Sequence, residues 1–225
     1  MTEHSIPSAH LPVSRKAGIH RATTGEAWDC LLFLDGELYT DRLKAPTILC
    51  EAAMTCVYLP NSSAAARHAD YTCNEAFATF VAEELPRWIE REVGRFERLF
   101  LCGLSLSALQ AVFTALRHPG VFAGVLAQSP SAWWQEEWLA ANIPAQPSRT
   151  QHFWLSVGTQ ELQTNVSHPP TPLVQTTSQL DSVRRLSTAL SAAGHDIHLN
   201  EYEGGHDPVC WGAELREALA WLMKR

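Results

Sequence analysis

The stretch FLCGLSLSALQ, residues 100–110, contains a serine at the point where a buried strand gives way to a helix. The run RLFLCG is short and apolar, which is typical of a strand buried on both faces. After Ser105, apolar residues recur at helical spacing until HPG interrupts them: Leu106, Leu109, Val112, Phe113 and Leu116. G-x-S-x-S differs by one residue from G-x-S-x-G, the motif that holds a nucleophilic serine on a sharp strand-to-helix turn. Ser105 is therefore a candidate nucleophile, and a serine at a helix N-cap is the alternative.

Outward from this stretch, apolar runs alternate with amphipathic segments along most of the chain. The expected strands lie within DCLLFLDGE, PTILCEAAMTCVYLPNSS (one strand), RLFLCG, VFAGVLAQS, QHFWLSVG and IHLNEY. The expected helices lie at 72–92, 106–117, 178–193 and 211–225; the first has Thr72 and Glu75 at capping-box spacing and a bend near Pro86. Such alternation predicts an α/β fold with a mostly parallel sheet and helices on both faces.

Composition predicts one compact domain. The chain has 225 residues, 46% of them hydrophobic, and we expect a short polar N-terminal lead at 1–26 followed by a single catalytic domain at 27–225. The net charge of −7 with scattered Lys and Arg argues against nucleic acid as a partner. No signal-like or membrane-spanning run occurs, and the six cysteines lack C-x-x-C spacing, which favours a cytoplasmic protein with free thiols that binds no membrane. The oligomeric state is left open.

A serine hydroxyl becomes a good nucleophile only beside a base that something else orients. In α/β-hydrolases the partners follow as serine, acid and histidine, the last two after late strands. Glu161 follows QHFWLSVG and His206 lies in EGGHD after the last strand, so Ser105, Glu161 and His206 form the predicted catalytic set. A serine–histidine dyad remains an alternative, as do three other carboxylates for the acid: Asp181, Asp196 and Asp207.

Acyl transfer also needs donors for the oxyanion. The backbone N–H of Leu106 and one from the DGE turn, with Glu37 the preferred residue, are the candidates. Ser107 replaces the last glycine of the motif, at a small steric cost. The histidines lack H-x-x-x-H spacing and there is no phosphate loop or dinucleotide motif, so we expect no metal and no cofactor.

Several long segments together resemble the enterochelin (ferric enterobactin) esterases, in the esterase D-like branch of the α/β-hydrolases. The segments are LFLDGE, RHADYTCNEAFATFVAEELPRW, GLSLSALQAVFTALRHPGVFAGVLAQSPSAWW, LSVGTQE and EGGHDPVCW. The resemblance implies a serine esterase that cuts the ester bonds of a trilactone catecholate siderophore and releases iron inside the cell. By position it assigns the nucleophile to Ser105, the histidine to His206 and the acid to Glu161.

The resemblance also points to substrate contacts. Arg67 falls where a cation could meet catecholate or carboxylate oxygens, with a structural salt bridge as the alternative, and Trp134 matches the family's tryptophan after the S-x-S turn. Two features depart from the family: Ser107, and a short polar lead where many members carry a separate N-terminal domain. The proline- and threonine-rich stretch 164–178 is a candidate flexible rim.

Two other functions fit the same residues. One is a different acyl transfer, by a general carboxylesterase, a thioesterase or an acyltransferase. The other is a catalytically silent protein of this fold that binds a siderophore. Ser105 and His206 count against the silent protein, and Ser107 counts slightly for it.

Overall fold

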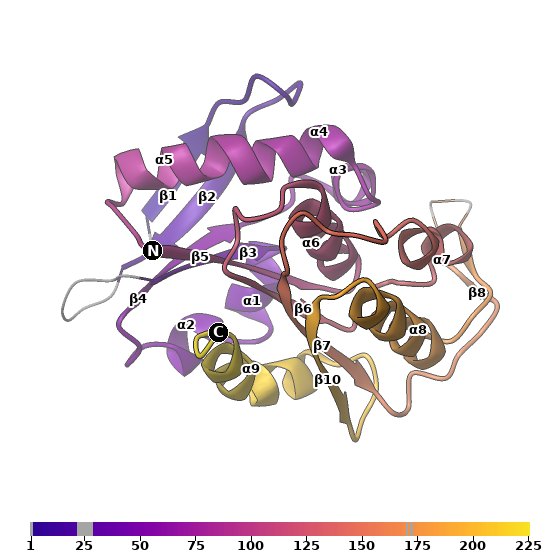
Figure 1. The fold of residues 1–225 in the computed structure, drawn as a ribbon. Coiled ribbons are helices and arrows are strands. Elements are labelled where there is room, and N and C mark those ends of the chain that lie inside the picture. Colours follow the sequence, from indigo (N-terminus) through magenta and orange to yellow (C-terminus); the bar gives the residue numbers. More distant parts are fainter. Residues whose placement is uncertain (1, 22–28, 170, 172) are drawn as a thin grey trace.

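The computed structural model describes residues 2–21, 29–169, 171 and 173–225, and its centre is one eight-stranded sheet (Figure 1). The strand order is β1-β2-β4-β3-β5-β6-β7-β10. These strands span Thr2–Ile6 (β1), Arg15–His20 (β2), Asp29–Leu34 (β3), Met54–Leu59 (β4), Arg98–Leu104 (β5), Gly124–Gln128 (β6), His152–Gly158 (β7) and Asp196–Tyr202 (β10). From β4 to β10 all neighbours are parallel, whereas β1 and β2 pair antiparallel. The expected α/β-hydrolase type of sheet is confirmed.

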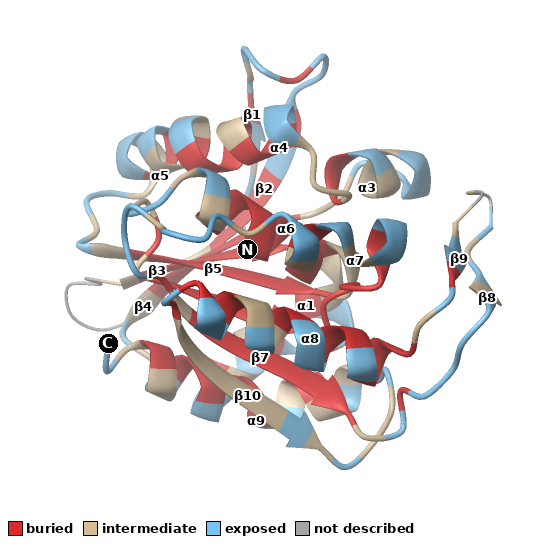
Figure 2. Ribbon diagram, turned by 45° about the vertical axis from the view of Figure 1, so that its right-hand side comes forward, coloured by how far each residue is buried: buried red, intermediate tan, exposed pale blue. Residues whose placement is uncertain are grey.

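Helices cover both faces of the sheet (Figure 1). One face packs against α3 (Ala64–Asp70), α4 (Glu75–Thr79), the π-helix η1 (Phe80–Glu84), α5 (Leu85–Glu92), α6 (Leu106–Arg117), α7 (Trp134–Ala141) and α8 (Gln179–Ala192). The other packs against α1 (Gly36–Asp41), α2 (Ala45–Ile48) and α9 (Pro208–Leu222). The central strands are almost wholly buried, as Figure 2 shows. A parallel sheet that is covered on both faces has no side exposed to solvent, which explains why these strands are continuous apolar runs in the sequence.

The N-terminal segment differs from the polar lead expected over residues 1–26. Residues 2–20 contribute β1 and β2 to the edge of the sheet, with Ile6, Ala17 and Ile19 buried. Arg15 is also buried, because it forms an ion pair with Asp70 at 2.8 Å. The expected domain boundary at 26/27 lies outside the described residues. Short edge strands whose apolar residues are interleaved with polar ones give a weak sequence signal.

The helix expected over 72–92 is divided and begins later. Asn74, not Thr72, is the N-cap, and its side chain accepts the Phe77 N–H at 2.9 Å. The π-helical turn at 80–84 directly precedes Pro86 in the first turn of α5. Proline lacks an N–H and its ring clashes with the carbonyl four residues earlier, so a wider turn accommodates it where a bend was expected.

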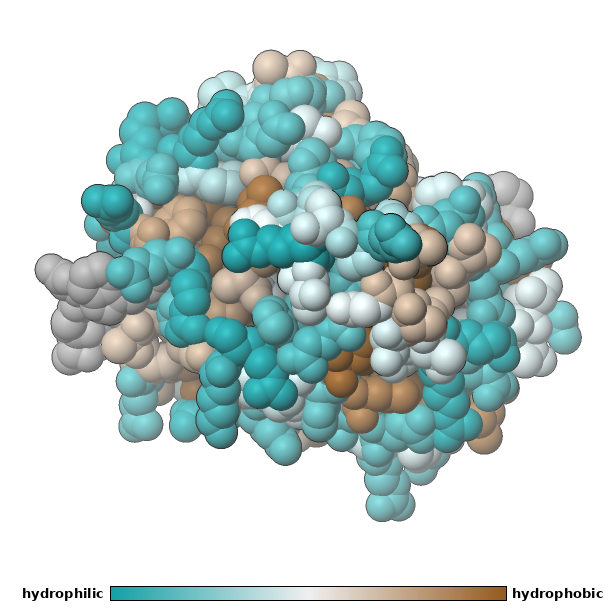
Figure 3. Space-filling view, in the orientation of Figure 1, coloured by the Kyte–Doolittle hydropathy of each residue, from teal (hydrophilic) through white to brown (hydrophobic). Residues whose placement is uncertain are grey.

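The candidate rim at 164–178 contains a two-stranded ribbon, β8 (Val166–Ser167) and β9 (Val174–Gln175), beside residues 170 and 172 that lie outside the described part. On the face seen in Figure 3 hydrophilic residues predominate between smaller apolar patches. Among the described residues, none of the helices is long and apolar enough to cross a membrane.

Candidate active site

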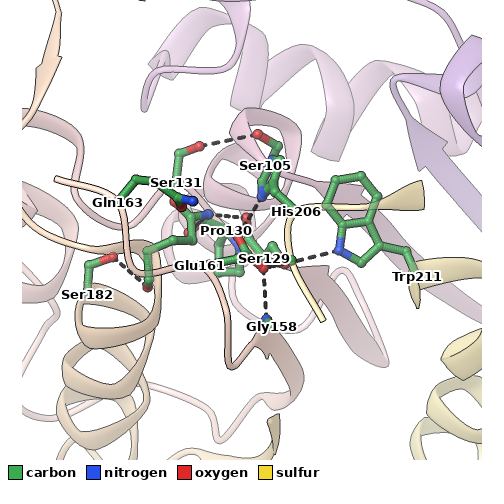
Figure 4. A network of polar contacts seen from close by, with 12 residues as sticks. Ser105, Ser129, Pro130, Ser131, Gly158, Glu161, Gln163, Ser182, His206 and Trp211 are labelled. Carbon is green, nitrogen blue, oxygen red and sulfur yellow. Dashed lines mark hydrogen bonds and ion pairs between the residues drawn. The ribbon is translucent and has the colours of Figure 1, made fainter. Parts of the chain in front are cut away.

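Four neighbouring strands deliver polar side chains to one edge of the sheet. Ser105 follows β5, Ser129 follows β6, Glu161 lies beyond β7 and His206 lies beyond β10. Since these strands are parallel and adjacent, their carboxyl ends meet at this edge, where α/β proteins bind their ligands. Figure 4 shows the four side chains in one network of polar contacts.

Ser105 occupies a strained turn between β5 and α6. Its backbone has φ 56° and ψ −120°, a conformation that L-residues rarely adopt and that is frequent at functional sites. The Ser105 N–H donates to Gln128 O on β6 at 2.8 Å. Gly103 makes the turn possible, because a Cβ at this position would clash with the Ser107 backbone. Ser105 is the N-cap residue of α6, but its side chain makes no capping hydrogen bond, so helix capping does not account for the serine.

Glu161 and His206, the predicted acid and base, are paired by a hydrogen bond at this edge of the sheet. His206 Nδ1 lies 2.6 Å from Glu161 Oε2, which leaves Nε2 available for a serine hydroxyl. Only 3% of Glu161 is exposed. Burial alone would raise the pKa of Glu161, but the hydrogen bond and charge of His206, with donors from Gly158 and Ser129, lower it below its ordinary value. The carboxylate is therefore held charged beside the imidazole.

The three other candidate carboxylates have separate partners. Asp181 accepts the Ser178 hydroxyl at 2.7 Å at the start of α8. Asp196 contacts His152 and Arg225 at the opposite end of its strand. Asp207 is the N-cap of α9, where it accepts the Val209 N–H at 2.8 Å. The geometry favours Glu161 as the acid.

The serine itself is not yet bonded to the histidine. Among the described residues, the hydrogen bond of Ser105 Oγ is with Ser131 Oγ, at 3.5 Å, while in the view of Figure 4 His206 lies between Ser105 and Glu161. Catalytic hydrogen bonds are often long without substrate and tighten in the complex.

Ser107, which replaces the usual glycine, is built into the turn. It is fully buried, and its Oγ accepts the Leu104 N–H at 2.9 Å and donates to Leu104 O at 2.8 Å. The hydroxyl thus binds the last peptide of β5 and fastens the helix start to the strand end. The serine that departs from the motif therefore acts as a tether between the start of α6 and the end of β5.

We expect Ser107→Ala to lower the free energy of unfolding by about 1–3 kcal/mol, since it deprives two buried backbone groups of a partner. Urea unfolding at neutral pH measures this change. Ser191→Ala, at an exposed position of α8, is the matched control and should change stability by less than about 0.5 kcal/mol. Equal stabilities for the two variants would show that the tether contributes nothing.

The two predicted oxyanion donors lie at helix starts. Leu106 is the first residue of α6 and Glu37 the second of α1, positions whose N–H groups have no backbone carbonyl partner within their own helix. The helices follow β5 and β3, which are neighbours in the sheet. Both donors thus belong to the same edge as Ser105.

Arg67 forms a salt bridge within the protein, which was the alternative to a direct substrate contact. Its Nε and Nη2 bind both oxygens of Asp35, at 2.6–3.0 Å, and Asp35 is fully buried at the β3–α1 turn. Burial alone would lower the pKa of Arg67, but the hydrogen bond and charge of Asp35 raise it. With 23% of its side chain exposed, Arg67 still reaches the surface near the turn that carries Glu37.

Trp134 is mainly a packing residue in this structure. It is 8% exposed and packs edge-to-face against Trp138, with ring centroids 6.2 Å apart. Its neighbour Trp133 stacks on His168 of the ribbon segment at 4.6 Å. This stacking connects the loop after β6 to the rim at 164–178.

Sequence reasoning missed Ser129, Tyr202 and Trp211. Ser129 donates to Glu161 Oε1 at 2.7 Å, Tyr202 lies 3.1 Å from the same oxygen, and Trp211 contacts both hydroxyls. Ser129 follows a strand, Tyr202 ends one, and Trp211 belongs to the segment EGGHDPVCW. These positions were the only features of the sequence that pointed to them.

The chain resembles known proteins along most of its length. A family model described as "Putative esterase" matches residues 8–222. The "Iron(III) enterobactin esterase" of Dickeya dadantii (strain 3937) is 29% identical over 163 residues, which cover 67% of this chain and 36% of that protein. The protein of the same name from Escherichia coli (strain K12) is 25% identical, with 94% and 54% covered.

A solved structure shares the fold. The crystal structure of the enterobactin esterase from Shigella flexneri in the presence of enterobactin has a TM-score of 0.81 at 23% identity, with 99% of this chain and 59% of that chain covered. The chain thus spans between about a third and three fifths of the length of these relatives. The resemblance noted in the sequence is confirmed. Because the family model matches nearly every residue, the chain belongs to the family described as "Putative esterase".

Proposed function

We propose that this chain is a serine esterase that hydrolyses the ester (lactone) bonds of a catecholate siderophore such as enterobactin. The observation that carries the chemistry is the hydrogen bond between His206 and the buried Glu161, at the sheet edge where Ser105 sits on its strained turn. The substrate class rests on the relatives, which are named as iron(III) enterobactin and salmochelin esterases.

The reaction has two halves. Ser105 Oγ attacks the ester carbonyl while His206 Nε2 takes its proton, and Glu161 holds the imidazole in the tautomer with Nε2 free. The N–H groups of Leu106 and Glu37 stabilise the oxyanion. His206 returns the proton to the leaving serine hydroxyl of the substrate, and water, activated by the same imidazole, then releases the acyl group from Ser105. Iron takes part only as cargo of the substrate.

Arg67 and Trp134 are the proposed substrate contacts. The exposed part of the Arg67 guanidinium suits catecholate or carboxylate oxygens, while Asp35 neutralises it and fixes its direction. The Trp134 N–H donates to Ser131 O and its ring packs against Trp138, so Trp134 supports the loop after β6 and shapes this wall of the site.

The test is a mass-spectrometric product profile of a catecholoyl-serine trilactone, with and without Fe³⁺. We expect linear trimer, dimer and monomer from the wild-type protein and none from Ser105→Ala. The trilactam analogue, with amides in place of the ring esters, should stay intact. An intact trilactone beside rapid cleavage of a simple aryl ester would overturn the substrate and leave a general esterase. Binding without cleavage of either ester would indicate the silent protein.

A further inference from the structure

Oε1 of Glu161, the carboxylate oxygen that His206 does not use, lies in a cluster of hydrogen-bond donors. It accepts the Gly158 N–H at 2.8 Å and the Ser129 hydroxyl at 2.7 Å, and the Tyr202 hydroxyl lies 3.1 Å away. These groups come from β7, from the end of β6 and from β10. Three elements therefore converge on one oxygen atom, and the remaining oxygen faces His206.

Trp211 restricts where the two hydroxyl protons can point. Its indole Nε1 lies 3.0 Å from Ser129 Oγ and 2.9 Å from Tyr202 Oη (Figure 4 labels Ser129 and Trp211). An indole N–H can only donate, so both hydroxyl oxygens accept from Trp211. Their own protons must then point elsewhere. For Ser129 the nearest acceptor is Glu161 Oε1 at 2.7 Å. The Tyr202 hydroxyl has three acceptors within reach: Ser129 Oγ at 3.0 Å, Glu161 Oε1 at 3.1 Å and Gly205 O at 3.2 Å; once Ser129 Oγ accepts from Trp211, Glu161 Oε1 is the nearest charged acceptor.

The protonation states agree with this arrangement. Burial, together with the charge of Glu161, raises the pKa of Tyr202, so its hydroxyl stays protonated and able to donate. The titratable groups that face Glu161 are His206, Tyr202 and Cys210, from the loop after β10, from β10 and from α9. Of these only His206 can carry a positive charge, and Gly158, Ser129 and Tyr202 stabilise the carboxylate by donating hydrogen bonds.

Trp211 also connects this cluster to the nucleophile. Its ring packs edge-to-face against His206, with centroids 4.8 Å apart, and its backbone carbonyl accepts Gln128 Nε2 at 2.9 Å. The Gln128 carbonyl in turn accepts the Ser105 N–H. One residue of α9, through its side chain and its backbone carbonyl, thereby contacts the acid's donors, the imidazole and the residue that binds the Ser105 N–H.

We propose that Ser129, Tyr202 and Trp211 are positioning residues that keep Glu161 ionised and aimed at His206, with Trp211 setting the direction of both hydroxyl protons. This inference rests on the proposed function only for its kinetic consequence. The cluster acts on Glu161 whichever ester the site takes.

The first test is a titration of the Glu161 carboxyl carbon by NMR, assigned by its loss in Glu161→Gln. Tyr202→Phe removes one donor without changing the ring, and Ser129→Ala removes the other. Each should raise the midpoint by roughly half to one pH unit, since a carboxylate with fewer donors binds its proton more tightly. Trp211→Phe should raise it less, because the hydroxyls remain. Tyr39→Phe is the matched control: it loses a buried tyrosine hydroxyl bonded to Gln128, and the Glu161 midpoint should not move.

The second test is the pH dependence of kcat/KM on an aryl ester. Loss of a donor should shift the acid limb to higher pH in the same variants, and lower kcat by roughly tenfold with KM unchanged. A purely structural role would lower the folded fraction at every pH and leave the limb in place. Unchanged Glu161 midpoints would overturn the inference. Shifted midpoints in a protein that cleaves no ester would overturn the proposed function alone.

Discussion

Replacing Ser105 by alanine should lower kcat for any ester substrate by at least about 10⁴-fold and abolish covalent labelling by a fluorophosphonate. In the proposed mechanism the hydroxyl on the strained turn is the atom that forms the acyl-enzyme, and without it binding plus oxyanion stabilisation leave only a small residual rate. The measurement pairs steady-state kinetics with intact-protein mass spectrometry after labelling. The strained backbone should persist, because alanine has no bulk beyond Cβ to disturb it.

Ser131→Ala is the control for this variant, because Ser131 Oγ lies 3.5 Å from Ser105 Oγ and is its nearest rival. Ser131 is 2% exposed and has no histidine partner among its recorded contacts in the described part of the chain. The Ser131→Ala variant should still form the fluorophosphonate adduct, and its kcat should fall by less than about tenfold. An adduct that survives Ser105→Ala and disappears in Ser131→Ala would reassign the nucleophile.

The core of the fold could be predicted because its strands and helices show local patterns of apolar residues. Each central strand is a continuous apolar run, buried on both faces, and α6 and α8 carry apolar residues at helical spacing. The order of Ser105, Glu161 and His206 could be predicted for the same reason. Each follows a recognisable strand, and parallel strands bring their carboxyl ends to one edge.

What the sequence did not reveal depends on distant pairings. Ser129 meets Tyr202 and Trp211 across 73 and 82 positions, and no local pattern marks a serine as a donor to a carboxylate. β2 was missed because the burial of Arg15 depends on Asp70, 55 positions away. Ser107 was read as a steric cost, since its bonds to Leu104 exist only once the turn has formed.

Glu161→Gln should lower kcat by about 10³–10⁴-fold with little change in KM. An amide in place of the carboxylate no longer stabilises the imidazolium that forms when His206 takes the Ser105 proton, and it favours the wrong histidine tautomer. Asp207→Asn is the matched control, because asparagine also caps a helix and, among the described residues, the Asp207 carboxylate accepts the Val209 N–H and the His206 imidazole pairs with Glu161. It should leave kcat within about threefold of wild type. A large loss in Asp207→Asn with a small one in Glu161→Gln would exchange their roles.

The same variant makes a prediction about stability and pH. The folded protein lowers the pKa of Glu161, so the carboxylate stabilises the fold above the pKa that it has in the unfolded chain. This contribution is lost as the pH falls through the lower, folded-state pKa. Wild type should therefore be more stable than Glu161→Gln at neutral pH, and urea unfolding curves of the two should converge as the solution is acidified below about pH 4. A difference that stays constant across this range would mean that the buried side chain contributes through its packing, and that its charge, on which the catalytic role depends, adds nothing to the fold.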